Sequence, residues 1–355
     1  MLDKVSAMNL LRQLFPKNQS SIGFISLLLL LLSACSSEVT TSTGIPSTLN
    51  PRGSAAADID ALWWLMFVLG TLVFVFVTGL LLYILFRRRR YQPEHGEVDL
   101  NPPESHSWLW YGGVIMPAVI LSVVLFFTLR SISATAQPAR DTAIEIQVIG
   151  RQWFWQINYI NEIFSTANEI HIPVGQPVLL RLTSADVIHS FWVPQLHGKM
   201  DLIPGRTNTF WIQADEPGKY RGICAEYCGI QHAKMHLVVV AGSEEEYAQW
   251  VEQQRQPAPV TTDEQIERGR EVFENSDCAF CHTIRGTTAE GKIGPDLTHV
   301  GSRETIAAGA LPNTRGNLGA WIADPQHIKP GSFMPSVALD SEEFIAVLDF
   351  LQSLE

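Results

Sequence analysis

The sequence predicts a multidomain membrane protein that consists of a two-helix transmembrane hairpin, an all-β domain and an all-α domain, in that order. Three observations indicate this fold class. Two long apolar runs lie at residues 61–86 and 108–129, short runs of alternating apolar residues begin at Ile144, and a helical stripe of apolar residues closes the chain. The composition agrees, because 46% of the residues are hydrophobic and only 17% are charged, which is apolar for a soluble protein.

Residues 1–34 predict a signal peptide of the lipoprotein type. A basic start precedes an apolar run at residues 22–32, which is too short to cross a bilayer and is typical of a secretory signal. Cys35 directly follows Leu-Ser-Ala, which resembles the lipobox of bacterial lipoproteins and implies a lipid on Cys35 after cleavage. An ordinary signal peptide with a chance cysteine is the alternative. Residues 35–60 would then form an external N-terminal segment.

The two apolar runs predict a transmembrane hairpin within residues 61–130. At about 1.5 Å per residue, each run is long enough to cross a hydrocarbon core of about 30 Å. Four arginines at 87–90 follow the first run, so the positive-inside rule places this loop in the cytoplasm. We therefore expect a two-helix protein of the bacterial cell membrane, with both soluble domains on the external, periplasmic side. A buried core hairpin is the alternative, and the lengths of the runs argue against it.

We predict that residues 131–251 form the all-β domain. After the alternating segment at Ile144, further short apolar runs occur at 177–183, 208–214 and 236–242, separated by the turn signals PVGQ, IPGR and EPGK. Short strands at this spacing are typical of an antiparallel sandwich or a Greek-key barrel.

A cluster of metal-ligand residue types lies near the end of this domain, in the sequence CAEYCGIQHAKM at 224–235. Zinc fits less well, because a methionine is present and a second cysteine pair is absent, whereas thiolate, thioether and imidazole together suit copper. A single blue copper centre uses one cysteine. Two cysteines therefore favour two coppers bridged by Cys224 and Cys228, with His232 as a terminal ligand and Met235 as a weak axial ligand.

Such a copper pair needs a second imidazole from elsewhere in the chain. The histidine in DVIHSFWVP, His189, follows a predicted strand and is the favoured candidate. His171 and His197 remain as alternatives, because composition does not exclude them.

We predict that residues 263–355 form an all-α domain that binds haem. A polar linker with Pro-Ala-Pro at residues 252–262 precedes it. The motif CAFCH is the attachment signal for c-type haem, in which the thiols of Cys278 and Cys281 bond to the haem and His282 binds the iron. A redox-active CxxC followed by a chance histidine is the alternative, and it would need a thioredoxin-like βαβ pattern that this segment lacks.

A sixth iron ligand is expected later in the chain, and Met334 in PGSFMPS is the favoured candidate because methionine ligation suits an electron carrier. His299 and His327 are the alternatives. A capping box of Thr262 and Gln265 is predicted to begin the first helix of the domain. The apolar stripe of the terminal segment DSEEFIAVLDFLQSLE predicts its closing helix, as in a compact class I cytochrome c.

Three stretches, GRQWFWQINY, VIHSFWVPQLHGKMDLIPGR and CAEYCGIQHAKM, resemble the copper A domain of cytochrome c oxidase subunit II. The lipoprotein start and the helical hairpin resemble that subunit in bacteria, so the resemblance covers roughly residues 35–250. It implies a cupredoxin-like Greek-key domain and an electron-entry role for Trp153. It also implies that the side chain of Glu226 faces a magnesium site shared with subunit I. The copper A ligands that it implies are His189, Cys224, the backbone carbonyl of Glu226, Cys228, His232 and Met235.

The resemblance implies the electron-entry subunit of a cytochrome c oxidase in a respiratory chain. Electrons would pass from cytochrome c or another donor through haem c and copper A to the haem of subunit I, which reduces oxygen to water and pumps protons, with subunit III as a further partner. Residues 61–86 and 108–129 contain no histidine and no charged residue, so this chain cannot itself hold an oxygen-reducing centre in the membrane. The family usually has a proton-channel glutamate near the start of the second helix, but this sequence has Trp110 there.

Other functions remain open at the level of sequence. The chain could be the electron-entry subunit of a copper A nitric-oxide reductase, which would differ only in its partner, or a membrane-tethered copper carrier. A quinol oxidase subunit II shares the fold but lacks copper ligands, so Cys224 and Cys228 argue against it. The formal net charge of −11 argues against nucleic-acid binding.

Overall fold

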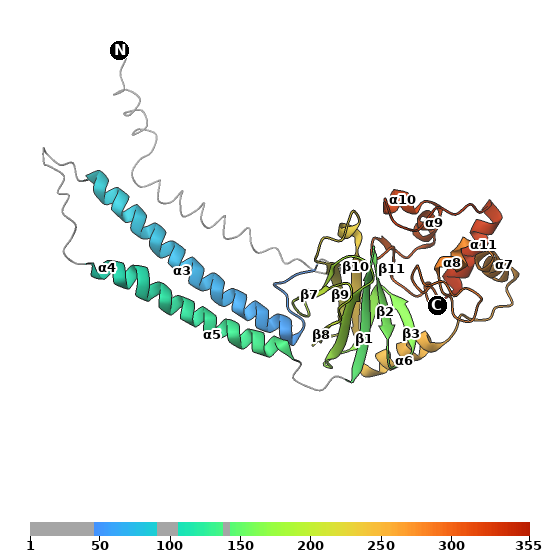
Figure 1. The fold of residues 1–355 in the computed structure, drawn as a ribbon, viewed down its shortest axis with the longest axis horizontal. Helices are drawn as coiled ribbons and strands as arrows, with labels where there is room; N and C mark the ends of the chain where they lie inside the picture. Colours follow the sequence, from blue (N-terminus) through green and yellow to red (C-terminus); the bar gives the residue numbers. More distant parts are fainter. Residues whose placement is uncertain (1–45, 91–105, 138–142) are drawn as a thin grey trace, which may run out of the picture. The chain divides into compact units, whose positions relative to one another are not determined.

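The computed structural model describes residues 46–90, 106–137 and 143–355, and Figure 1 shows their elements. The predicted signal peptide, the lipidation candidate Cys35 and the loop at residues 91–105 lie outside the described residues. Predictions that fall on them are therefore carried by the sequence alone.

Two long helices form the predicted hairpin (Figure 1). The first is α3 (Ser54–Arg90), and the second runs through α4 (Ser107–Trp110), the π-helical turn η1 (Tyr111–Ile115) and α5 (Met116–Ala136). Each contains an 18-residue window of high mean hydropathy, 2.6 in the first and 2.4 in the second, and both are long enough to cross a membrane. Both extend beyond the predicted apolar runs, and the segment before the first run contains three alanines, the residue with the highest helix propensity.

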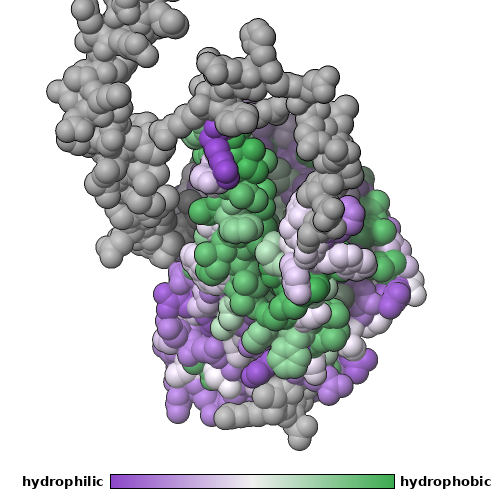
Figure 2. All heavy atoms as spheres, turned by 90° about the vertical axis from the view of Figure 1, so that its left-hand side faces the viewer, coloured by the Kyte–Doolittle hydropathy of each residue, from purple (hydrophilic) through white to green (hydrophobic). Residues whose placement is uncertain are grey.

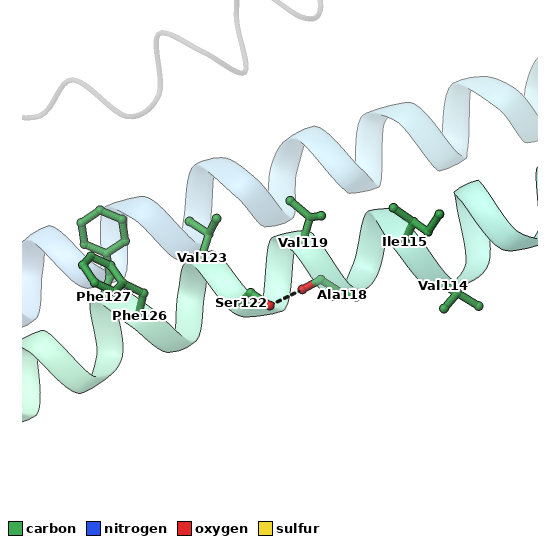
Figure 3. Close-up of a pocket in the computed structure, with 8 residues that line it drawn as sticks. All are labelled: Val114, Ile115, Ala118, Val119, Ser122, Val123, Phe126 and Phe127. Carbon is green, nitrogen blue, oxygen red and sulfur yellow. Dashed lines mark hydrogen bonds between the residues drawn. The ribbon is translucent and has the colours of Figure 1, made fainter.

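Most of the large exposed apolar side chains lie on these helices, and hydrophobic side chains gather in the middle of the face that Figure 2 shows. Figure 3 shows a shallow groove along η1 and α5, where the Ser122 hydroxyl donates to the carbonyl of Ala118 at 2.7 Å. No ionisable side chain lines this groove. It therefore suits hydrocarbon contact and offers no chemistry.

Two five-stranded sheets build the β domain, in the strand orders β3-β2-β1-β5-β8 and β4-β10-β9-β6-β7 (Figure 1). Most neighbours are antiparallel, but β1 pairs with β5 and β4 pairs with β10 in parallel. The two sheets confirm the predicted β-sandwich fold, and the two parallel pairs depart from the antiparallel pairing expected because the chain crosses to the second sheet at β4 before it returns to the first at β5. The strands are β1 (Ile144–Arg151), β2 (Phe154–Tyr159), β3 (Phe164–Ala167), β4 (Glu169–Pro173), β5 (Val178–Ser184), β6 (His189–Trp192), β7 (Lys199–Leu202), β8 (Asn208–Ile212), β9 (Gly218–Cys224) and β10 (His236–Gly242).

The sandwich core comes from the alternating apolar residues that the sequence pattern singled out. Ile146 and Val148 are fully buried in β1, and Trp155 and Phe191 meet edge to face between the sheets at a ring-centroid distance of 6.0 Å. These aromatic rings make the centre of the domain rigid, because they interlock with little free volume.

Helix α6 (Glu244–Arg255) closes this domain and begins with a capping box between Ser243 and Glu246. It continues through residues 252–255, which the sequence had assigned to the linker, because Val251 packs into the sandwich core and Gln254 is also buried, with its carbonyl accepting a hydrogen bond from Arg285. The extended connection therefore begins at about residue 256.

The C-terminal domain has its own apolar core, separate from that of the sandwich. Its elements are α7 (Glu264–Glu274), α8 (Asp277–Cys281), β11 (Thr305–Ile306), β12 (Leu311–Pro312), α9 (Arg315–Ala323), α10 (Pro325–Ile328) and α11 (Ser341–Ser353). The predicted cap at Thr262 is wrong, because the carboxylate of Asp263 accepts the N–H groups of Gln265 and Ile266 and so begins α7. The closing helix α11 has a capping box between Asp340 and Glu343.

Candidate metal centre and haem pocket

Two buried cysteines form the centre of the first site. Cys224 ends β9 and Cys228 lies in the loop that follows, with their sulfur atoms 3.7 Å apart. The backbone N–H of Cys224 donates to the carbonyl of Met235 at 3.0 Å, so the copper loop, residues 224–235, closes on itself. A disulfide would need about 2.05 Å between the sulfurs, so the two cysteines are not bonded to one another.

The other predicted donor atoms surround this sulfur pair. His189 Nδ1 lies 3.9 Å from the Cys224 sulfur, and the carbonyl oxygen of Glu226 lies 3.2 Å from it. His232 Nδ1 and Met235 Sδ lie 3.7 Å and 3.8 Å from the Cys228 sulfur. Ligands that share a metal ion at about 2.0–2.3 Å stand at such separations from one another. The structure thus brings all the predicted copper donors together, with one imidazole nitrogen beside each sulfur.

His189 is held in place by a carboxylate that the sequence analysis did not single out. Its Nε2 lies 2.8 Å from Asp186 Oδ1, so Nε2 carries the proton and Nδ1 is left to face Cys224. The other carboxylate oxygen of Asp186 accepts the N–H of Gln152 at 2.7 Å. Although burial raises the pKa of Asp186, these hydrogen bonds outweigh burial and leave the pKa below its usual value. An acid three residues before a candidate ligand was the available signal.

The two cysteines shift each other's pKa in opposite directions. Hydrogen bonding with Cys228 lowers the pKa of Cys224 to about 3, and the same contact raises the pKa of Cys228. A metal that takes both sulfurs as thiolates therefore displaces the remaining proton.

The alternative histidines have other contacts. His171 stacks on Trp250 at a ring-centroid distance of 3.9 Å. His197 packs against Phe210 and Trp211, and burial lowers its pKa to about 4. Neither lies among the donor atoms around the cysteines in the described part of the chain.

A second site surrounds a cavity of about 410 Å³ that is lined by Cys278, Cys281, His282 and Met334. This volume lies within the usual range for cofactor sites. His282 Nδ1 donates to the carbonyl of Pro295 at 2.8 Å, which fixes the tautomer and leaves Nε2 available for iron. Burial lowers the pKa of His282, so the ring is neutral, as a ligand must be. The residues present therefore fit a c-type haem.

The two alternative axial ligands do not line this cavity. Both ring nitrogens of His299 are engaged, by the carbonyls of Glu355 at 2.9 Å and Gln256 at 3.1 Å. His327 is exposed on α10. Met334 is therefore the one of the three candidates that faces the cavity in the described structure.

Trp153 connects the two sites. Its indole ring lines the haem cavity, and its Nε1 donates to the carbonyl of Cys228 at 2.9 Å. The buried side chain of Lys329 donates to the carbonyl of Trp153 at 2.9 Å. The sequence offered no signal for Lys329, because a lysine beside proline and glycine resembles an ordinary surface residue.

The hairpin and the two sites define a membrane-anchored electron-transfer protein with a copper-type and a haem-type domain. Residues 161–242 match the family described as cytochrome c oxidase subunit II, periplasmic domain, and residues 266–355 match the family described as cytochrome c. These matches imply copper A in the first domain and haem in the second.

Relatives match almost the whole chain. The chain is 36% identical to cytochrome c oxidase subunit 2 of Alkalihalophilus pseudofirmus, over 93% of this chain and 96% of that protein. It is 31% identical to quinol oxidase subunit 2 of Bacillus cereus, over 67% of this chain and 80% of that protein. Among solved structures, the periplasmic domain of subunit II of cytochrome oxidase from Bradyrhizobium japonicum is 31% identical, covers 33% of this chain and 97% of that chain, and has a TM-score of 0.32.

The chain therefore belongs to the cytochrome c oxidase subunit 2 family, as the resemblance predicted. Its role is that of the electron-entry subunit of a cytochrome c oxidase.

Proposed function

We propose that this subunit accepts electrons at a covalently bound haem c, passes them to a binuclear copper A centre, and delivers them to the haem of subunit I. Subunit I would use them to reduce oxygen to water and to pump protons. One observation carries this proposal. Two cysteine sulfurs 3.7 Å apart are surrounded by two imidazole nitrogens, a thioether and a carbonyl oxygen, and a haem-attachment motif lines a cavity shared with Trp153.

Each ligand has a separate task in this proposal. Cys224 and Cys228 would bridge two coppers, with His189, His232, Met235 and the carbonyl of Glu226 as the remaining ligands. A bound copper pair would take up and release one electron without a proton. The protein keeps its ligands in fixed positions for this purpose, because the loop is closed by backbone hydrogen bonds and His189 is held by Asp186. Rigid ligands suit rapid electron transfer, since little has to rearrange when the charge changes.

The haem site has a similar division of labour. Cys278 and Cys281 would form the thioether bonds to the haem, and His282 and Met334 would be its iron ligands. The hydrogen bond from His282 to Pro295 holds the imidazole ring in one orientation. Methionine ligation favours a higher potential than two histidines would give, which suits acceptance of electrons from a reduced carrier.

The remaining predictions extend this function. Both soluble domains lie outside the bacterial cell membrane, Cys35 carries a lipid, and subunit III completes the complex. The exposed side chain of Glu226 is available for a magnesium ion shared with subunit I.

The test is a Cys228→Ser substitution in the full chain purified with its partners. The variant should lose the copper pair but keep its haem absorption, because the second site shares no ligand with the first. Copper analysis and low-temperature paramagnetic resonance report this, since a mixed-valent pair that shares one electron gives seven hyperfine lines. Two coppers per chain in the variant would contradict the assignment. Oxygen or nitric oxide uptake by the wild-type complex separates an oxidase from a nitric-oxide reductase.

A further inference from the structure

The copper domain (residues 143–255) and the haem domain (residues 263–355) meet in a specific, polar interface. The backbone N–H of His236, next to the copper loop, donates to the carbonyl of Ala308 at 2.9 Å. The N–H of Glu304 donates to the Glu169 carboxylate at 3.0 Å. The first bond joins backbone groups of both domains, and the second joins a backbone N–H to a buried carboxylate, so together they restrict the relative orientation of the two domains.

One segment of the haem domain covers the copper loop. This docking segment, residues 328–333, accepts hydrogen bonds from two side chains of the loop. The Gln231 side chain donates to the carbonyl of Pro330 at 2.7 Å, and Lys234 donates to that of Ile328 at 2.5 Å. Gly331 approaches so closely that a Cβ there would stand 2.3 Å from Ile230 Cδ1.

Lys329 is the buried centre of the docking segment. It exposes only 3% of its surface, and its ammonium group donates to three carbonyls. Two of these belong to the copper domain, Trp153 at 2.9 Å and Lys234 at 3.1 Å, and the third is Ala307 at 3.1 Å. Three acceptors match the three N–H donors of an ammonium group. Loss of the Lys329 side chain would leave these buried carbonyls without a hydrogen-bond donor in the docked arrangement, and this would weaken the association of the two domains.

A chain of contacts joins the haem cavity to the copper loop. Phe333, which precedes the axial-ligand candidate Met334, stacks on Trp153 with ring centroids 6.0 Å apart and planes 10° apart. Trp153 in turn donates its indole N–H to Cys228. Trp153 exposes only 8% of its surface, so a soluble carrier cannot reach this ring in the docked arrangement.

From these contacts we propose that the haem domain is docked on the copper domain as a fixed internal donor, with Lys329 as the clamp and the Phe333–Trp153 stack as the electron contact. A reduced one-electron carrier protein then reduces the haem and not the copper centre directly. Lys329, Phe333 and Trp153 would hold the two sites in place while one electron passed from a reduced haem to an oxidised copper pair, with no bond made or broken and no proton transferred. This inference rests on the proposed function, because it assumes that both cofactors are bound.

The experiment compares Lys329→Met with Lys219→Met in the full chain within the purified complex. Lys219 forms an exposed ion pair with Glu304 across the same interface, so it is a matched control. Removal of an exposed ion pair should change the association of the domains little. We expect Lys329→Met to keep its copper and haem content. Hydrogen exchange at the amide of His236 should become about tenfold faster, and flash-induced electron transfer from haem to copper about tenfold slower. The Lys219 variant should match the wild type in both measurements.

A second variant separates the clamp from the contact. Phe333→Leu should slow haem-to-copper transfer while the His236 amide stays protected, because the Phe333 ring is largely exposed and the hydrogen bonds of Lys329 to the copper domain remain. Unchanged exchange and unchanged transfer in Lys329→Met would overturn the proposal, as would reduction of copper before haem when a reduced carrier is mixed with the wild type. If the wild type held no copper pair or no haem, the proposed function would fail. The exchange comparison would still decide whether Lys329 docks the domains.

Discussion

The contact between Asp186 and His189 predicts a measurable effect on copper binding. The Asp186 carboxylate accepts His189 Nε2 at 2.8 Å and the backbone N–H groups of Gln152 and Val187 at 2.7 Å each. In an Asp186→Asn variant, an NH₂ group replaces one acceptor oxygen, so at least one of these donors loses its partner. Hydrogen bonds to charged groups contribute about 1.5–3 kcal/mol, and the lower end applies because this side chain is 29% exposed. We therefore expect about tenfold weaker copper binding, within the range observed for partners of metal ligands.

Competition with a copper chelator measures this affinity in the full-length chain in detergent. Asp215→Asn is the control, because Asp215 is exposed and its carboxylate accepts a side-chain hydrogen bond from Gln213 at 2.7 Å, which does not involve a copper-ligand candidate. Haem absorption should be the same in both variants and the wild type. Equal copper affinity of Asp186→Asn and the wild type would refute the positioning role, and an equal loss in Asp215→Asn would show that the effect is not specific to the His189 contact.

Two further predictions concern the packing of the haem domain and the response of the copper domain to acid. Gly269→Ala should lower the free energy of unfolding of the haem domain by about 1–3 kcal/mol, because a Cβ there would stand 2.0 Å from the carbonyl oxygen of Ala346, where α7 packs on α11. Gly316→Ala is the control, because a Cβ there meets open space, and it should be neutral or stabilising. Thermal unfolding followed by haem absorption measures both variants. Burial lowers the pKa of His197 from about 6.5 to about 4, and its Nδ1 accepts the N–H of Gly198. Between these pH values the unfolded chain binds a proton that the folded chain excludes. The free energy of unfolding should therefore fall by up to about 3 kcal/mol as the pH drops from 6.5 to 4. Denaturant unfolding should show a smaller loss of stability over this pH range for His197→Gln than for the wild type. An identical pH dependence in the two proteins would contradict a buried neutral His197.

Much of the architecture follows from patterns that are local in the sequence. Hydropathy alone located both helices of the hairpin, because the bilayer sets a minimum length for an apolar run. The copper loop and the CAFCH motif place several ligands within a few residues, so chain connectivity keeps these groups near one another in any fold. Strand positions were predictable because the alternation of apolar and polar residues shows which face of a strand is buried. The parallel pairing of β4 with β10 was not predictable, since the relative direction of two strands depends on how the chain crosses between the sheets.

Sequence by itself determined the family, the chemistry of the short motifs and the division into a hairpin and two domains. Tertiary structure decided which distant groups meet them. Pairing of Phe191 with Cys224 between β6 and β9 brings His189 to the cysteines and leaves His171 and His197 elsewhere. Packing of one domain on the other buries Lys329 beside Trp153. These contacts join residues far apart along the chain, and the free energy that selects them belongs to the assembled core and interface, not to any one segment.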